Sequence, residues 1–144
     1  MKGEPGKSGW LLDTHAFFWM VQGDARLGRK LEPGRLDGAA DAGRLHLSVI
    51  SVWEIAMLES KNRLALDVEC REWVEMALSA SRVRLAPLDP EISVLSTRLP
   101  DFPNSDPADR IIVATATVMD WKLVTADKAI LRYLESRNQE AIAL

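Results

Sequence analysis

The stretch that decides the fold is residues 10–21, WLLDTHAFFWMV. Its first three residues form a short apolar run that ends in an acid, which predicts a buried strand over residues 10–13. From His15 to Val21 the side chains are apolar on every side, which predicts a buried helix. The stretch therefore predicts one strand that passes directly into a helix, with the Asp13 carboxylate at the junction.

The same alternation of strand and helix continues along the chain. Further strands are predicted over residues 45–49, 83–88, 121–125 and 141–144. Helices are predicted over residues 51–59, 68–79, 89–99, 106–119 and 127–136, with broken helical pieces over residues 23–43. This order is typical of a three-layer α/β fold, with a mostly parallel sheet of four or five strands flanked by helices. Such sheets bind ligands beyond the carboxyl ends of the strands, where the strand order reverses.

Length and composition indicate one domain without a membrane span. The chain has 144 residues, and we expect a flexible tail over residues 1–9 and a folded domain over residues 10–144. No run of 18 apolar residues is present, so no membrane contact is expected. The single cysteine, Cys70, excludes an internal disulfide and suits the cytoplasm. The net charge of -3 argues against a simple nucleic-acid clamp, because such proteins are basic.

Four acids fall at one edge of the predicted sheet. Asp13 ends the first strand, and Asp127 follows the fourth. Glu54 is expected in the first turn of the helix after the second strand, and Asp109 in the first turn of the helix before the fourth. Carboxylates this close repel one another and require a cation. A hard divalent ion such as Mg²⁺ fits oxygen ligands, so we interpret the four acids as a metal site.

Other kinds of site have less support in the sequence. There are two histidines, His15 and His46, and no Cys/His spacing typical of zinc. His15 more often caps a helix or packs than binds a hard ion. No glycine-rich phosphate loop is present.

Structural roles for the same residues also have to be considered. Ser51 and Glu54 fit a capping box, in which the acid serves the start of its own helix. Asp106 fits an N-cap before Pro107, and Asp127 also suits a helix start. The aromatic residues near the acids are expected in the core more than on a binding surface, with an oligomer contact of some of them left open; they are Phe17, Phe18, Trp19 and Trp53. The coincidence of four acids on one edge favours the metal site.

Four segments together resemble PIN-domain proteins, and among these the VapC-type toxins of bacterial toxin–antitoxin pairs. They are LLDTH (11–15), SVWEIA (51–56), DPADRIIVATA (106–116) and LVTAD (123–127). Each motif alone is weak, but four in this order and spacing are a strong signal. The resemblance extends over nearly the whole chain from Leu11 onward.

The resemblance implies an endoribonuclease that depends on Mg²⁺ or Mn²⁺, cuts structured cellular RNA and stops translation. It also implies a homodimer inhibited by a small antitoxin protein. The family's four acids match Asp13, Glu54, Asp109 and Asp127, which would be the catalytic residues and metal ligands. Thr125 matches a hydroxyl near the metal. Two weaker supporting positions are Thr14 and Asp106.

Three other functions remain open at this point. One is a PIN-type nuclease in RNA processing or DNA repair without a toxin role. Another is a non-catalytic PIN scaffold, against which the complete set of acids argues. The third, from a different class, is a phosphate-accepting receiver module. That module requires an acid that ends the third strand and a Lys that ends the fifth, and neither is found here.

Overall fold

The strands form one parallel sheet. The computed structural model describes residues 9–28, 31–32 and 34–144, so the predicted tail lies outside the described residues except for Gly9. The strands are β1 (Trp10–Leu12), β2 (Leu45–Ser48), β3 (Arg84–Ala86), β4 (Lys122–Thr125) and β5 (Ala141–Ala143). Their order across the sheet is β3-β2-β1-β4-β5, and all four pairings are parallel. The predicted parallel sheet is confirmed, with five strands.

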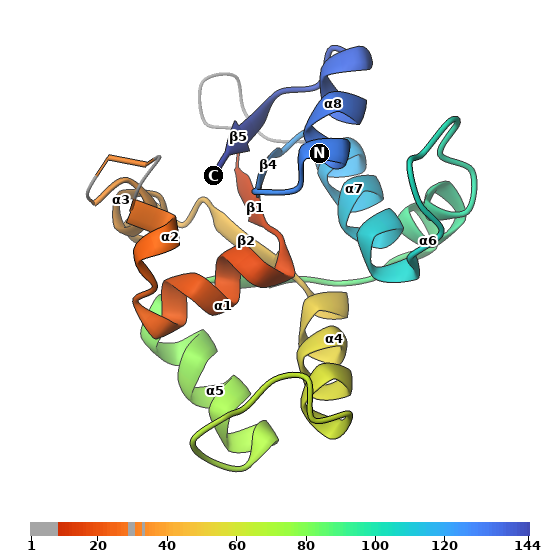
Figure 1. Ribbon diagram of the computed structural model, residues 1–144. Helices are drawn as coiled ribbons and strands as arrows, with labels where there is room; N and C mark the ends of the chain where they lie inside the picture. Colours follow the sequence, from red (N-terminus) through yellow and green to blue (C-terminus); the bar gives the residue numbers. More distant parts are fainter. Residues whose placement is uncertain (1–8, 29–30, 33) are drawn as a thin grey trace.

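Helices surround the sheet on both faces (Figure 1). They are α1 (Thr14–Gln22), α2 (Ala25–Gly28), α3 (Arg35–Asp41), α4 (Val49–Ser60), α5 (Cys70–Ser81), α6 (Pro90–Ser96), α7 (Pro107–Met119) and α8 (Lys128–Ser136). The broken helical pieces expected over residues 23–43 are α2 and α3. In the described part of the chain, no helix is long and apolar enough to cross a membrane.

Alternating strand residues build a core on each face. Leu12 and Val124 belong to a cluster with residues of α1, α3 and α5, including Phe17 and Trp73. The neighbouring strand residues Leu11 and Leu123 belong to a second cluster. That cluster contains Ile112, Val113 and Ala116 of α7 and Ile130, Tyr133 and Leu134 of α8. The three layers expected from the sequence are therefore present, because successive strand side chains point to opposite faces.

The strand order reverses between β1 and β4. After β1 the chain moves to β2 and β3 on one side, and it later returns to β4 and β5 on the other. Leu12 pairs with Val124, so the residues that follow these strands emerge side by side. Asp13 and Asp127 therefore lie at the kind of crevice where parallel sheets bind ligands.

Two expectations about helices are wrong. Only Thr14, Ala16 and Phe17 are buried in α1, so this helix covers the core with one side instead of being enclosed. The helix expected to begin at Ser51 begins at Val49, because the Ser48 side chain already accepts a hydrogen bond from the backbone N–H of Ile50. Ser48 and not Ser51 is the N-cap, and the predicted capping box does not form.

Two rings stack near the amino ends of the strands, away from the acids. The His46 ring stacks on the Trp121 ring, with 3.7 Å between the centroids and 8° between the planes. A Cβ added to Gly9 would lie 2.6 Å from the Trp121 side chain, so only glycine fits there. Burial, together with the nearby Arg84 charge, lowers the pKa of His46 from 6.5 to about 4.

Candidate active site

An acidic pocket opens where β1 and β4 end. Its carboxylates are Asp13, Glu54, Asp106, Asp109 and Asp127, and the other lining residues are Thr14, His15, Trp19, Ala126 and Ile130. These residues come from the β1–α1 junction, α4, the start of α7 and the start of α8. The structure therefore brings all four predicted acids together, with the two supporting positions Thr14 and Asp106 beside them. Their convergence is a property of the fold, because 114 sequence positions separate the first acid from the last.

Asp13 is held firmly at the base of the pocket. It is the N-cap of α1, and its Oδ1 accepts a hydrogen bond of 2.7 Å from the backbone N–H of Ala16. Its Oδ2 accepts a hydrogen bond of 2.5 Å from the hydroxyl of Thr125. Thr125 is fully buried, and its Oγ1 also accepts a hydrogen bond from the backbone N–H of Asp127, at 3.1 Å. One hydroxyl thus links the acids that follow β1 and β4.

The pKa of Asp13 is raised from its ordinary value, chiefly because the carboxyl group is buried. The hydrogen bonds from Thr125 and Ala16 act in the opposite direction, as does the neighbouring His15. The Glu54 carboxylate adds a smaller effect that raises the pKa further. Asp13 is thus an acid that the pocket disfavours in its charged form unless a cation is near.

Asp109 is the second perturbed acid, and Asn104 is its partner. The pKa of Asp109 is raised from 3.8 to about 6, first by burial and then by the negative charge of Asp106, with smaller effects from Glu54 and Asp127. The Asn104 Nδ2 donates a hydrogen bond of 3.0 Å to the Asp109 Oδ2, which partly offsets that rise. The Asn104 Oδ1 accepts a hydrogen bond from the backbone N–H of Asp106.

Sequence reasoning missed Asn104. Asn104 lies between the helices predicted over residues 89–99 and 106–119, where no site residue is expected from the sequence. An Asn two residues before Asp-Pro is a signal for a local turn, since Asn side chains bond to the backbone two residues on. The turn was therefore readable from the sequence, but the contact with Asp109 was not.

Glu54 enters the pocket from α4. It lies in the second turn of this helix and not in the first, because α4 begins at Val49. Within the described residues, its half-buried carboxylate has no hydrogen-bond or ion-pair partner. The neighbouring Ser51 is fully buried, and its Oγ accepts a hydrogen bond of 2.9 Å from the Thr14 hydroxyl. The Thr14 hydroxyl therefore joins α1 to α4. Because Glu54 has no partner within the described residues, its carboxylate is available to a ligand.

Asp106 and Asp127 both cap helices at the rim of the pocket. The Asp106 Oδ1 accepts a hydrogen bond from the backbone N–H of Ala108, which confirms the predicted N-cap of α7. The Asp127 Oδ1 accepts one from the backbone N–H of Ile130 and caps α8. Each carboxylate keeps a second oxygen, so capping does not exclude an additional role.

The donor chemistry of the pocket fits a hard divalent cation. Its charged ligands are carboxylate oxygens, and the mutual repulsion that raises the pKa of Asp109 would be relieved by a positive ion. Within residues 9–28, 31–32 and 34–144, no three His, Cys, Asp or Glu side chains are arranged as a complete metal-binding group. Mg²⁺ does not require one, because it binds through one or two protein carboxylates and keeps several waters.

Aromatic residues near the pocket differ in exposure. Phe17 is buried, as expected, and Trp19 is half-buried at the pocket wall. Trp53 was expected in the core, but it is 56% exposed on α4 next to Glu54. Val49, one turn earlier on the same helix, is 39% exposed. An apolar surface therefore lies beside the acidic pocket.

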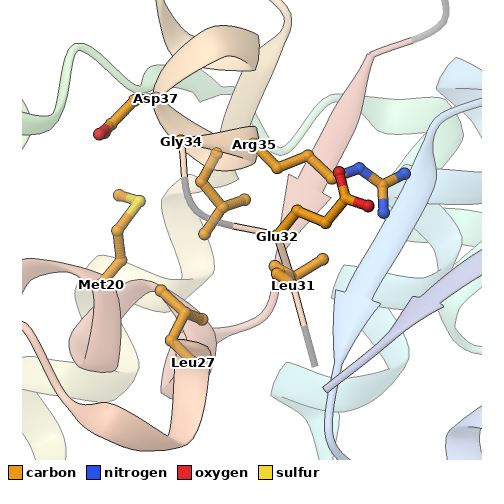
Figure 2. Close-up of a pocket in the computed structure, with 8 residues that line it drawn as sticks. Met20, Leu27, Leu31, Glu32, Gly34, Arg35 and Asp37 are labelled. Atoms are coloured by element: carbon orange, nitrogen blue, oxygen red, sulfur yellow. The ribbon is translucent and has the colours of Figure 1, made fainter. Parts of the chain in front are cut away.

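A second hollow lies between α1, α2 and the start of α3 (Figure 2). Met20, Leu27 and Leu31 contribute apolar walls, and Figure 2 shows Arg35 and Asp37 pointing away from one another. This hollow shares no residue with the acidic pocket. Its charged lining residues are Glu32, Arg35 and Asp37, and the rest of its lining is apolar apart from Gly34.

Comparisons with known proteins identify the family of the chain. A family model described as PIN domain matches residues 10–135. The chain is 32% identical to Ribonuclease VapC22 of Mycobacterium tuberculosis (strain ATCC 25618 / H37Rv) over 132 residues, which cover 88% of this chain and 93% of the relative.

Solved structures share the fold. The crystal structure of VapBC2 from Rickettsia felis bound to a promoter DNA fragment matches with a TM-score of 0.63 and 16% identity, over 85% of this chain and 91% of that chain. DNA-bound VapBC from Salmonella typhimurium matches with a TM-score of 0.63 and 18% identity, over 94% of this chain and 96% of that chain.

Proposed function

The chain belongs to the PIN-domain family, and on that premise we propose that it is an endoribonuclease, the toxin of a toxin–antitoxin pair. Its relative in Mycobacterium tuberculosis is named a ribonuclease. Family membership also removes the receiver-module alternative. The RNA substrate would be a cytoplasmic one, and its cleavage would inhibit translation.

One observation carries the proposal: five carboxylates from four separate parts of the chain line a single pocket. A structural reason for each acid alone is available, since three of them cap helices. Capping does not explain Glu54 or Asp109, which are half-buried and face the same space. Nor does it explain why the pKa of Asp109 is raised to about 6 by its neighbours. Such perturbed acids in a pocket are typical of functional sites.

The residues proposed to hold the metal ion are Asp13, Glu54, Asp109 and Asp127, one or two of them directly and the others through water molecules of the ion. A bound Mg²⁺ or Mn²⁺ would supply an activated water and stabilise charge on the phosphoryl oxygens, so no nucleophilic side chain is required.

The protein's own part is to position these acids. Thr125 fixes the orientation of Asp13 through its hydroxyl. Asn104 holds one oxygen of Asp109, which lines the pocket. Supporting groups of this kind are important, because a site works only when its ligands are held close to the productive geometry.

The proposed partners are an antitoxin and a second copy of the chain. Structural neighbours include a structure described as a toxin–antitoxin complex from Klebsiella pneumoniae. The five carboxylates would attract a basic side chain of an antitoxin, which would compete with the metal ion for the same charges. The exposed apolar surface of Val49 and Trp53 is suited to contact with the second copy.

The test is RNA cleavage by the purified protein with and without divalent ions. We expect cleavage with Mg²⁺ or Mn²⁺ and none in excess chelator. Equal cleavage in chelator would refute the metal mechanism, and no RNA cleavage under any condition would favour the non-catalytic scaffold. The toxin role is tested separately by expressing the chain with and without its genomic neighbour. Growth arrest that the neighbour relieves supports this role, whereas normal growth in both strains contradicts it.

A further inference from the structure

A basic hollow adjoins the acidic pocket. It is lined by Asp101, Pro103, Ala129, Arg132, Tyr133, Ser136 and Arg137. Helix α8 contributes to both sites, because Asp127 at its start and Ile130 line the acidic pocket. The segment before α7 also contributes to both, since Asp101 and Pro103 line the hollow while Asp106 lines the acidic pocket. The two depressions share no lining residue, but both are bordered by α8 and by the segment before α7.

The exposed side of α8 carries positive charge that no acid neutralises. Lys128 and Arg132 are exposed, and within the described residues neither forms an ion pair. They are four positions apart and so lie on one face of the helix, where like charges are mildly destabilising. Glu135 is the nearest acid in sequence on that face, and it forms no ion pair with Arg132 in the described structure. Both side chains are therefore accessible to an anionic ligand.

Arg137 differs from these two residues because it is engaged by the protein. It donates a hydrogen bond to the carbonyl oxygen of Pro100, lies 3.5 Å from the Asp101 carboxylate, and packs over the Tyr133 ring at 5.2 Å. It therefore holds the 100–103 segment against the end of α8. Lys128 and Arg132 remain available for a ligand.

We propose that Lys128 and Arg132 bind backbone phosphates of the RNA strand next to the phosphate in the acidic pocket. This inference rests on the ribonuclease function proposed above. Asp127 and Arg132 are five residues apart, which corresponds to about 7.5 Å along the helix axis. A chain with a net charge of -3 and an acidic pocket requires such local cations to hold a polyanion.

The experiment compares the double variant Lys128→Ala/Arg132→Ala with Arg63→Ala/Arg98→Ala. The control removes the same charge from exposed residues that line neither the pocket nor the hollow. Binding of a fluorescent single-stranded RNA is measured by anisotropy in excess chelator, at salt concentrations from 50 to 200 mM. Without divalent ions the acidic pocket repels phosphate, so the affinity reports the basic surface.

Loss of two phosphate contacts should reduce the slope of log affinity against log salt by about 1.4. Between 50 and 200 mM salt, the wild type and the control should therefore lose about sevenfold more affinity than the double variant. In cleavage assays with Mg²⁺, the defect of the double variant should appear in KM and should not depend on RNA sequence.

Different failures have different meanings. If the wild type cleaves RNA but the double variant has the slope and KM of the control, this inference is wrong and the ribonuclease proposal stands. If the wild type neither binds nor cleaves RNA, both are wrong. If the double variant binds RNA normally but loses its genomic neighbour in co-purification, the surface binds an acidic protein segment and the inference is again overturned.

Discussion

Replacing Asp109 with Asn should abolish activity and stabilise the metal-free protein. The carboxyl group has a higher pKa in the folded chain, about 6, than its ordinary 3.8, so folding takes up a proton between these values. The contribution of this group to the free energy of unfolding is therefore greatest below pH 3.8. It falls as the pH rises through about 6 and then levels off. Asn cannot ionise, and its Oδ1 can still accept the hydrogen bond from Asn104.

The size of the effect follows from the same two values. Their difference corresponds to about 3 kcal/mol at 1.36 kcal/mol per pH unit. Because Asp109 is only partly buried, solvent screens its neighbours, and about half of this, ~1.5 kcal/mol, is expected. For a chain of this length, such a gain raises the melting temperature by roughly 5 °C.

Urea unfolding in excess chelator, at pH 8 and at pH 3.5, measures the effect. The gain of Asp109→Asn over the wild type should appear at pH 8 and vanish at pH 3.5. Asp67→Asn, at an exposed position that does not line the acidic pocket, is the control and should change little at either pH. A variant that is less stable than the wild type at pH 8, or equally stabilised at both values, would refute the repulsion argument.

Four further changes test other parts of the structure. Asp106→Asn should reduce RNA cleavage far less than Asp109→Asn, because Asn is an equally good N-cap; equal losses would show that the third acid was misassigned. Thr125→Val should lower cleavage by about 10- to 100-fold and the unfolding free energy by about 1–3 kcal/mol, since the buried Asp13 carboxylate loses a donor; unchanged kinetics would contradict this role. The pKa of His46 is lowered to about 4, so the stability that neutral His46 provides is complete above pH 6.5 and is lost as the pH falls toward 4. His46→Gln should flatten the urea midpoints over that range, and an unaltered pH dependence would count against it. Trp53→Lys should convert a dimer into a monomer in light scattering if the α4 surface joins two copies; an unchanged mass excludes that surface.

The sequence predicted the acids of the site better than their supports. Asp13 and Asp127 come after apolar runs that predict buried strands. A parallel sheet brings the carboxyl ends of such strands to the same edge. Glu54 was assigned to the right element but to the wrong turn. Ser48 and Ser51 are both good N-caps, and only the pairing of β2 with its neighbours decides where the strand stops.

Burial was harder to predict than secondary structure. The apolar segment of α1 and the Trp53 side chain were both expected in the interior, yet much of each faces outward. Hydrophobicity tells which side chains avoid water, but not whether the covering surface belongs to the same chain. Asn104 was missed for a related reason, because its contact with Asp109 depends on how the loop returns to α7.

The hydrogen bond between Thr125 and Asp13 spans 112 positions of the chain, and this has a consequence for biosynthesis. During translation β1 is made first, but β4, which pairs with its second edge, follows only about 110 residues later. Contacts of such long sequence separation form slowly, because the intervening chain must first be ordered. A nascent or truncated chain that stops before β4 carries Asp13, Glu54 and Asp109 without the strand that aligns them. The acidic pocket is thus complete only after β4 and the start of α8 have been synthesised.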